Sequence, residues 1–167
     1  NVSFENITNY IYFGNQGMPQ QHSGNIQVLA ADLQLNITTP WVNLDNSIVY
    51  QHSSSANLPL PALTLYNNLY YHDTWVKALD VQIGVDMRFF TKYYAPILNP
   101  ALGQFCVQNQ EQVGNYPVMN VYANFYVKHI RLKLFAQYQH FNASFMNKQY
   151  FAMPGYPMAP DMFRAGL

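Results

Sequence analysis

The segment Leu79–Phe89 alternates without interruption between apolar and polar side chains. Its odd positions are all apolar, whereas Asp80, Asp86 and Arg88 stand among the even ones. Successive side chains of a β-strand point to opposite faces, so this pattern predicts a strand with one apolar and one charged face. At about 3.3 Å per residue the segment would be roughly 33 Å long, whereas strands of soluble proteins usually have only ~5–6 residues.

The same period of two recurs along the chain, and no segment favours a helix. Pro, Gly and Asn separate the alternating segments, as expected for strands joined by turns and loops. The sequence therefore predicts an all-β fold with about eight antiparallel, up-and-down strands. They are expected at about 1–13, 25–38, 42–51, 62–71, 76–92, 118–128 and 131–141, with an eighth from Met162 and a short extra strand near 105–108.

The connections between these strands alternate between short and long. Short ones are expected at 38–41, 72–75 and 128–131, and long ones at 14–24, 52–61, 93–117 and 142–160. Outer-membrane barrels have tight turns at one end and long loops at the other, whereas a soluble sandwich has no reason to sort its connections in this way. The pattern predicts a transmembrane antiparallel β-barrel.

The composition agrees with a surface that does not face water alone. Charged residues make up 10% of the chain, against about 25% in ordinary soluble domains. No run of about 18 apolar residues is present, so no transmembrane helix is expected. The few Lys and Arg argue against nucleic acid as a partner. The single Cys106 excludes an internal disulfide and a cysteine-based zinc site.

The cost of charge in lipid decides which face would be wet. A charged side chain near the middle of the lipid face costs about 2–4 kcal/mol, so the charged face is expected to line the lumen. Aromatic residues beyond the two ends of the central strand, Trp75 and Tyr93, are expected at the membrane interfaces. The lumen-lining candidates are Asp80, Gln82, Asp86, Arg88, Lys92, Asn120, Asn124, Lys128, Lys133, Gln137 and Gln139.

Neither catalysis nor a cofactor is expected. His52 precedes Ser53–Ser55, but no acidic partner stands at a useful spacing. The five His residues show no i, i+2 or i, i+4 spacing for a metal. Three short matches to glycosylation sequons are expected by chance in a chain so rich in Asn, Ser and Thr.

Several stretches resemble the Bacteroidetes putative porin family, in family order and over nearly the whole chain. They include NITNYIYF, LDVQIGVDMRFFTKYYAP, GNYPVMNVYANFYVKHIRLKLFAQYQHFN and FRAGL, at 6–13, 79–96, 114–142 and 163–167. The resemblance implies a bacterial outer-membrane porin in contact with lipid and small solutes. It also implies that residues 1–167 are the C-terminal portion of a single, larger barrel domain, because family members are longer.

Two alternatives to a solute-passing porin remain open at this point. One is a closed barrel with a structural or assembly role, acting as a subunit of an outer-membrane complex. Complete pairing of the inward polar residues would favour it. The other is a soluble β-sandwich that binds glycans, with its apolar face turned to a core.

Overall fold

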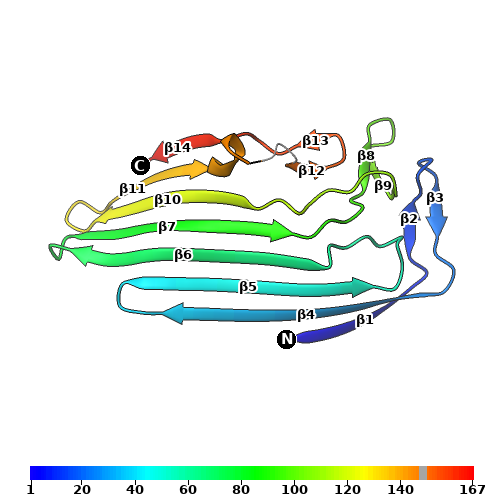
Figure 1. Ribbon diagram of the computed structural model, residues 1–167, viewed down its shortest axis with the longest axis horizontal. Coiled ribbons are helices and arrows are strands. Elements are labelled where there is room, and N and C mark those ends of the chain that lie inside the picture. Colours follow the sequence, from blue (N-terminus) through cyan, green and yellow to red (C-terminus); the bar gives the residue numbers. More distant parts are fainter. Residues whose placement is uncertain (147–149) are drawn as a thin grey trace.

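The computed structural model describes residues 1–146 and 150–167, and eight of its strands form one antiparallel sheet (Figure 1). The order across the sheet is β1-β4-β5-β6-β7-β10-β11-β14, so neighbours in space follow one another along the chain. The expected all-β fold with about eight up-and-down strands is confirmed. The strands are β1 (Val2–Thr8), β4 (Asn25–Thr38), β5 (Val42–Ser53), β6 (Leu63–Trp75), β7 (Leu79–Phe90), β10 (Val118–Val127), β11 (Leu132–Gln139) and β14 (Met162–Gly166).

The short and long connections lie at opposite ends of the sheet, as predicted. In Figure 1 the tight turns β4–β5, β6–β7 and β10–β11 lie together at the left, and the long connections lie at the right. We call these the turn end and the loop end. Among the described residues no helix is long and apolar enough to cross a membrane.

The loop end carries small structures of its own. The strands β2 (Ile11–Phe13), β3 (Pro19–Gln21), β8 (Ile97–Asn99) and β9 (Gln104–Cys106) form a second, four-stranded sheet in the order β3-β2-β9-β8. The strands β12 (Phe151–Met153) and β13 (Tyr156–Pro157) form a hairpin, and a 3₁₀ turn, η1, spans Phe141–Ser144. The expected short strand near 105–108 corresponds to β9.

The strand boundaries differ most from the prediction at two places. The first segment, expected as one strand over 1–13, breaks at Asn9, whose backbone is left-handed with φ 56°, so β2 leaves the main sheet. The expected break at 72–75 is instead strand, and the turn falls at Val76 and Lys77, with φ of 51° and 58°. Two successive positive φ values define a type I′ hairpin turn, and the N–H of Ala78 donates to the Trp75 carbonyl at 3.1 Å.

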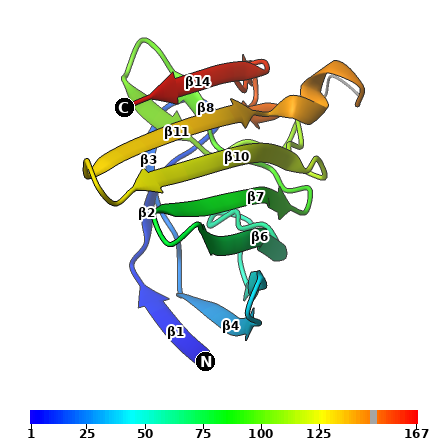
Figure 2. The same cartoon turned by 90° about the vertical axis from the view of Figure 1, so that its left-hand side faces the viewer.

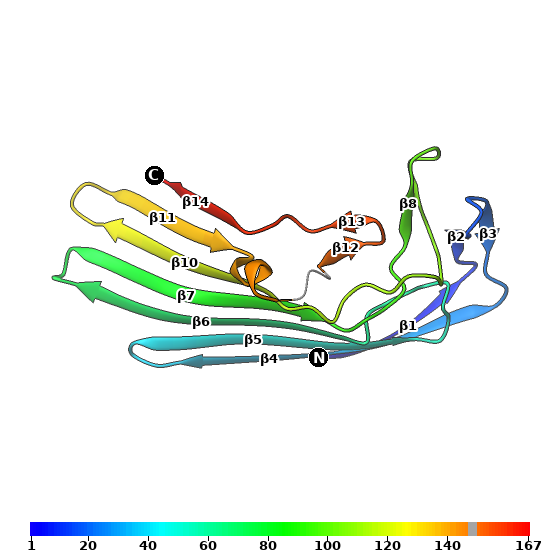
Figure 3. The ribbon, with the colours of Figure 1, turned by 45° about the horizontal axis from the view of Figure 1, so that its top comes forward.

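The sheet is a single curved layer, open along the edges formed by β1 and β14. Figure 2, viewed from the turn end, shows the strands following an arc, and Figure 3 shows β2, β3 and β8 standing on the side toward which the sheet curls. Within residues 1–146 and 150–167 no second sheet covers the other side, and large apolar residues there, such as Leu33 and Leu35, are 62% and 54% exposed. The eight main strands therefore form one layer and not the two packed layers of a β-sandwich.

Candidate functional site

The register of the sheet places the predicted polar residues of β7 and β10 on one face. Asp86 stands opposite Asn120, and Gln82 stands opposite Asn124. Because opposed residues of antiparallel strands point to the same side, all four share a face. Arg88 and Asp80 share it too, at i±2 positions along β7. We call this side the polar face.

The polar face continues across the other strands. On β11 it includes the predicted Lys133 and Gln137, opposite Tyr126 and Tyr122, and Gln139 follows at the next alternate position. None of the predicted lumen-lining residues lies on β1, β4, β5, β6 or β14, although side chains alternate there too. The register adds Glu5, Asp32, Gln34, Asn36, Asp45, Ser47, Tyr66, Asn68, Tyr70, His72 and Arg164.

Side chains of the polar face bind one another across the strands. Asn120 Nδ2 donates to Asp86 Oδ1 at 2.8 Å, and Asn124 Nδ2 donates to Gln82 Oε1 at 3.2 Å. At the turn end Asp80 accepts from Thr74 Oγ1 at 2.6 Å and lies 2.8 Å from Lys128 Nζ. Among the described residues the Lys128–Asp80 pair is the only salt bridge. Of these contacts only Asn120–Asp86 is part-buried, and the others are exposed, so polar pairs rather than an apolar core hold this face together.

Gly84 makes room for a contact that reaches across a whole strand. Tyr122 stands opposite Gly84, and a Cβ at position 84 would lie 2.7 Å from the Tyr122 ring. The Tyr122 hydroxyl instead passes over β7 and donates to Asn68 Oδ1 on β6 at 2.9 Å. Side chains from strands two apart converge in this way on the concave side of a curved sheet. The polar face is therefore the concave one.

Two cations of the polar face lie over aromatic rings. The Arg88 guanidinium carbon is 5.8 Å from the centre of the Tyr66 ring, and Lys133 Nζ is 6.0 Å from that of Tyr126. Neither forms an ion pair within the described residues. Their charge is therefore offset only by the face of a ring, a weaker contact than a salt bridge with a buried carboxylate. Both side chains are exposed.

Charge is unevenly divided along the concave side. All eight Lys and Arg residues follow position 76. The polar face thus carries Glu5, Asp32 and Asp45 on β1, β4 and β5, but Lys133 and Arg164 on β11 and β14. Acidic side chains therefore lie on one arm of the arc and basic side chains on the other.

A hollow of about 530 Å³ lies on the polar face near the turn end. His72, Gln82, Asn124 and Lys133 contribute to its lining, together with Tyr126. It contains both sides of the Asn124–Gln82 contact, so the polar face is recessed here rather than flush.

The remaining predicted residues lie at the ends of strands. Lys92 follows β7 and is exposed in the loop, and Lys128 begins the β10–β11 turn. Trp75 ends β6 opposite Leu79, on the apolar face. Tyr93 lies in the loop after β7 with its ring edge toward Phe90, 5.9 Å between centroids, and burial raises the pKa of its hydroxyl. The membrane-interface role of Trp75 and Tyr93 stays a prediction.

The convex side presents the apolar face. Its exposed members come from most of the strands, and Ile83 and Val85 at the middle of β7 are 42% and 40% exposed. Both Trp residues lie toward the turn end, with Trp41 in the β4–β5 turn 65% exposed and Trp75 45% exposed. Tryptophan is enriched where apolar membrane meets water. The sequence analysis noted Trp75 but missed Trp41, because that residue stands in a turn outside any alternating segment.

Comparisons with known proteins agree with this architecture. A family model described as "Putative porin" matches residues 1–167, the whole chain. No curated protein and no solved structure matches the chain. The match covers every strand of the sheet, and the chain belongs to the putative porin family.

Proposed function

We propose that the eight-stranded sheet is a wall of an outer-membrane β-barrel, with its polar face lining a water-filled lumen through which small solutes pass. The observation that carries this proposal is the division of one sheet into a concave charged face and a convex apolar face left exposed. In water the convex face would expose a large apolar surface, which soluble monomers avoid. A lipid bilayer would cover this apolar surface, while the charges of the concave face keep contact with water.

Strand length supports a membrane crossing. β7 has 12 residues, so it is roughly 36 Å long at about 3.3 Å per residue. Tilted by about 40°, it spans roughly 28 Å, close to the ~25 Å apolar band of outer-membrane barrels. The two Trp residues toward the turn end would mark one interface.

The free edges of β1 and β14 require partners in lipid. Each unpaired backbone N–H or C=O costs several kcal/mol in the hydrocarbon region, so only closed barrels are stable there. We infer that further strands, from the same polypeptide or from another subunit, complete the barrel. Barrels of about 16–18 strands leave an aqueous channel, whereas about eight strands leave an interior that side chains fill.

A closed barrel with a structural role remains the second candidate, because one observation favours it. The contacts Asn120–Asp86, Asn124–Gln82 and Lys128–Asp80 already satisfy much of the polar face. Arg88 and Lys133, which lack carboxylate partners among the described residues, favour the open lumen. Ion conduction separates the two candidates.

We expect the full-length protein, inserted in planar lipid bilayers, to give stepwise ion currents. Arg88→Glu should shift the reversal potential in a KCl gradient toward cation preference, because it replaces a lumen cation by an anion. The matched control is Arg131→Glu, the same charge change at an exposed residue of the β10–β11 turn. It should shift the potential less. Correctly inserted protein that carries no current would contradict solute passage and favour the closed barrel.

A further inference from the structure

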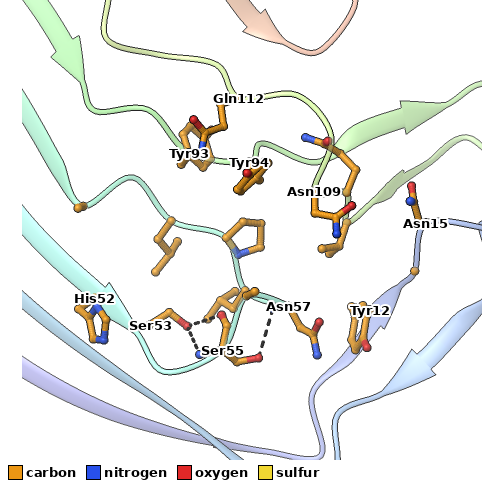
Figure 4. A pocket seen from close by; sticks show the side chains of 18 of the residues that line it. Tyr12, Asn15, His52, Ser53, Ser55, Asn57, Tyr93, Tyr94, Asn109 and Gln112 are labelled. Atoms are coloured by element: carbon orange, nitrogen blue, oxygen red, sulfur yellow. Dashed lines mark hydrogen bonds between the residues drawn. The ribbon is translucent and has the colours of Figure 1, made fainter.

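The loop end contains a hollow of about 640 Å³ that the channel proposal does not use (Figure 4). This volume lies in the range of about 300–1,000 Å³ typical of ligand sites. Four separate parts of the chain line it: residues 12–20 of the β2–β3 hairpin, 51–62 after β5, 92–94 after β7 and 107–112 after β9. We call it the loop-end hollow.

The loop-end hollow has a hydrogen-bonded frame. Phe13 of β2 pairs in parallel with Cys106 of β9, and the N–H of Val107 donates to the Phe13 carbonyl at 2.8 Å. The loop after β1 is thereby joined to the loop after β7. Loops held in this way are ordered before a ligand arrives, which lowers the entropic cost of binding.

Gln108 fixes the opposite wall. Its side chain is 7% exposed, and its Nε2 donates to the carbonyls of Ala95 and Glu111, both at 2.7 Å. Its Oε1 accepts from the N–H groups of Gln110 and Glu111 at 2.8 and 2.9 Å. All hydrogen-bonding atoms of this amide are used within the loop. Gln108 is therefore a brace, and its neighbour Asn109 is left to face the hollow.

The lining combines aromatic rings with amides and no carboxylate. Figure 4 shows Tyr93 and Tyr94 with Gln112 along one wall and Tyr12 and Asn57 toward another. Hydroxyls of Ser53 and Ser55 add to the set, and Lys92 is the one formally charged lining residue in the part of the chain that the structure describes. The amides of the lining are Asn15, Gln20, Gln51, Asn57, Gln108, Asn109 and Gln112.

Several of these amides have free hydrogen-bonding capacity. Among the described residues, Gln51, Asn109 and Gln112 make no side-chain hydrogen bond, whereas Asn57 Nδ2 lies 3.1 Å from His22 Nδ1. An amide offers two donors and an acceptor, so it can bind hydroxyls that both donate and accept. Tyrosine rings add flat apolar surface with a polar tip.

We propose that the loop-end hollow binds a neutral oligosaccharide. Sugar hydroxyls match the free amides, and the C–H face of a sugar ring matches Tyr12 and Tyr94. A phosphate or sulfate would find Lys92 alone, and a cationic ligand would find no carboxylate. The inference concerns binding, and it holds whether or not the lumen conducts.

The test is calorimetric titration of the full-length protein with maltohexaose, cellohexaose and chitohexaose, and with hexagalacturonate as the anionic comparison. The detergent should carry no sugar head group, because maltosides and glucosides would compete. We expect at least one neutral hexasaccharide to bind. Tyr94→Ala should weaken that binding roughly 5- to 10-fold, as expected for loss of one aromatic contact.

Two matched controls isolate the loop-end hollow. Tyr156 on β13 is 42% exposed, like Tyr94 at 40%, and does not line it, so Tyr156→Ala should leave affinity within twofold. Asn109→Ala should weaken binding, whereas Gln110→Ala, next to it but outside the lining, should not.

Three results would overturn the proposal. The first is an absence of binding to all three neutral sugars at millimolar concentration by protein that still inserts in membranes. The second is tighter binding of hexagalacturonate that Lys92→Gln abolishes. The third is equal loss of affinity in Tyr94→Ala and Tyr156→Ala.

Discussion

Ile83→Lys is expected to destabilise the membrane-inserted protein by about 2–4 kcal/mol, the cost of a lysine near the middle of a lipid-facing strand. Ile83 lies on the convex face between Val81 and Val85, and its side chain is 42% exposed. If that exposure is to lipid, the charge finds neither water nor a carboxylate nearby. Equilibrium unfolding in urea from lipid vesicles measures the difference.

The control for this variant is its neighbour Gln82→Lys. Gln82 lies on the polar face beside Asn124, where water or the nearby Asp80 can accept the new charge. Its free energy of unfolding should change by less than about 1 kcal/mol, as for a surface substitution. Equal losses for the two variants, or a larger loss for Gln82→Lys, would mean that the faces are assigned the wrong way round.

Asn142→Leu is the second change with a large expected effect. Asn142 is fully buried in η1, and its Oδ1 accepts from the N–H of Met119 at 3.0 Å. Its Nδ2 donates to the carbonyl of Pro117 at 2.7 Å and to the Tyr116 hydroxyl at 3.1 Å. Leucine would fill a similar space and leave the N–H of Met119 and the carbonyl of Pro117 without these partners, while the Tyr116 hydroxyl would keep its contact with His140 Nε2. Because each buried unpaired group costs about 1–3 kcal/mol, we expect a loss of at least 2 kcal/mol.

Asn142, Tyr116 and His140 form a hydrogen-bonded cluster that also anchors the loop before β14. Burial raises the pKa of Tyr116, so its hydroxyl stays protonated and can donate to His140 Nε2 at 2.9 Å. His140 Nδ1 lies 2.8 Å from the Ala159 carbonyl, which only accepts, so Nδ1 carries the proton. Replacement of Asn142 removes its hydrogen bond to Tyr116 and so weakens the cluster.

Limited proteolysis measures how often the loop before β14 opens, because the rate of cleavage follows the population of the opened loop. In Asn142→Leu, cleavage within 150–160 should be faster than in the unchanged protein. Asn36→Leu is the control, since Asn36 is exposed on β4 and makes no side-chain hydrogen bond among the described residues. Unchanged stability and cleavage in Asn142→Leu would show that the cluster does not hold the loop.

The alternation of side chains was sufficient to predict the strands. The predicted segment 25–38 has the bounds of β4, whereas 76–92 extends beyond β7 by three residues at its start and two at its end. Strict alternation locates a strand because a sheet with two unlike faces imposes it on the sequence. Turns were harder. Val76 and Lys77 adopt positive φ although Asn-Gly is the usual signal for a type I′ turn, so nothing in the sequence marks this turn.

Most of the structures at the loop end could not be predicted from the sequence. The pairing of Phe13 with Cys106 joins residues far apart in the chain, and no local pattern encodes such a contact. The candidate lumen residues were easier, because Asp80, Asp86 and Arg88 share a parity that the register converts directly into a face. Asn68 and Tyr66, which stand opposite Asp86 and Arg88, were not predicted.

The central claim is that lipid covers one face of the sheet and water the other. Single Cys residues at each position from 80 to 89, in a Cys106→Ser background, can carry a fluorophore in the full-length protein in lipid vesicles. We predict that lipid-borne nitroxides quench the odd positions and an aqueous quencher the even ones, with a period of two. Equal quenching on both faces, or aqueous quenching at Ile83 and Val85, would contradict a membrane-spanning wall.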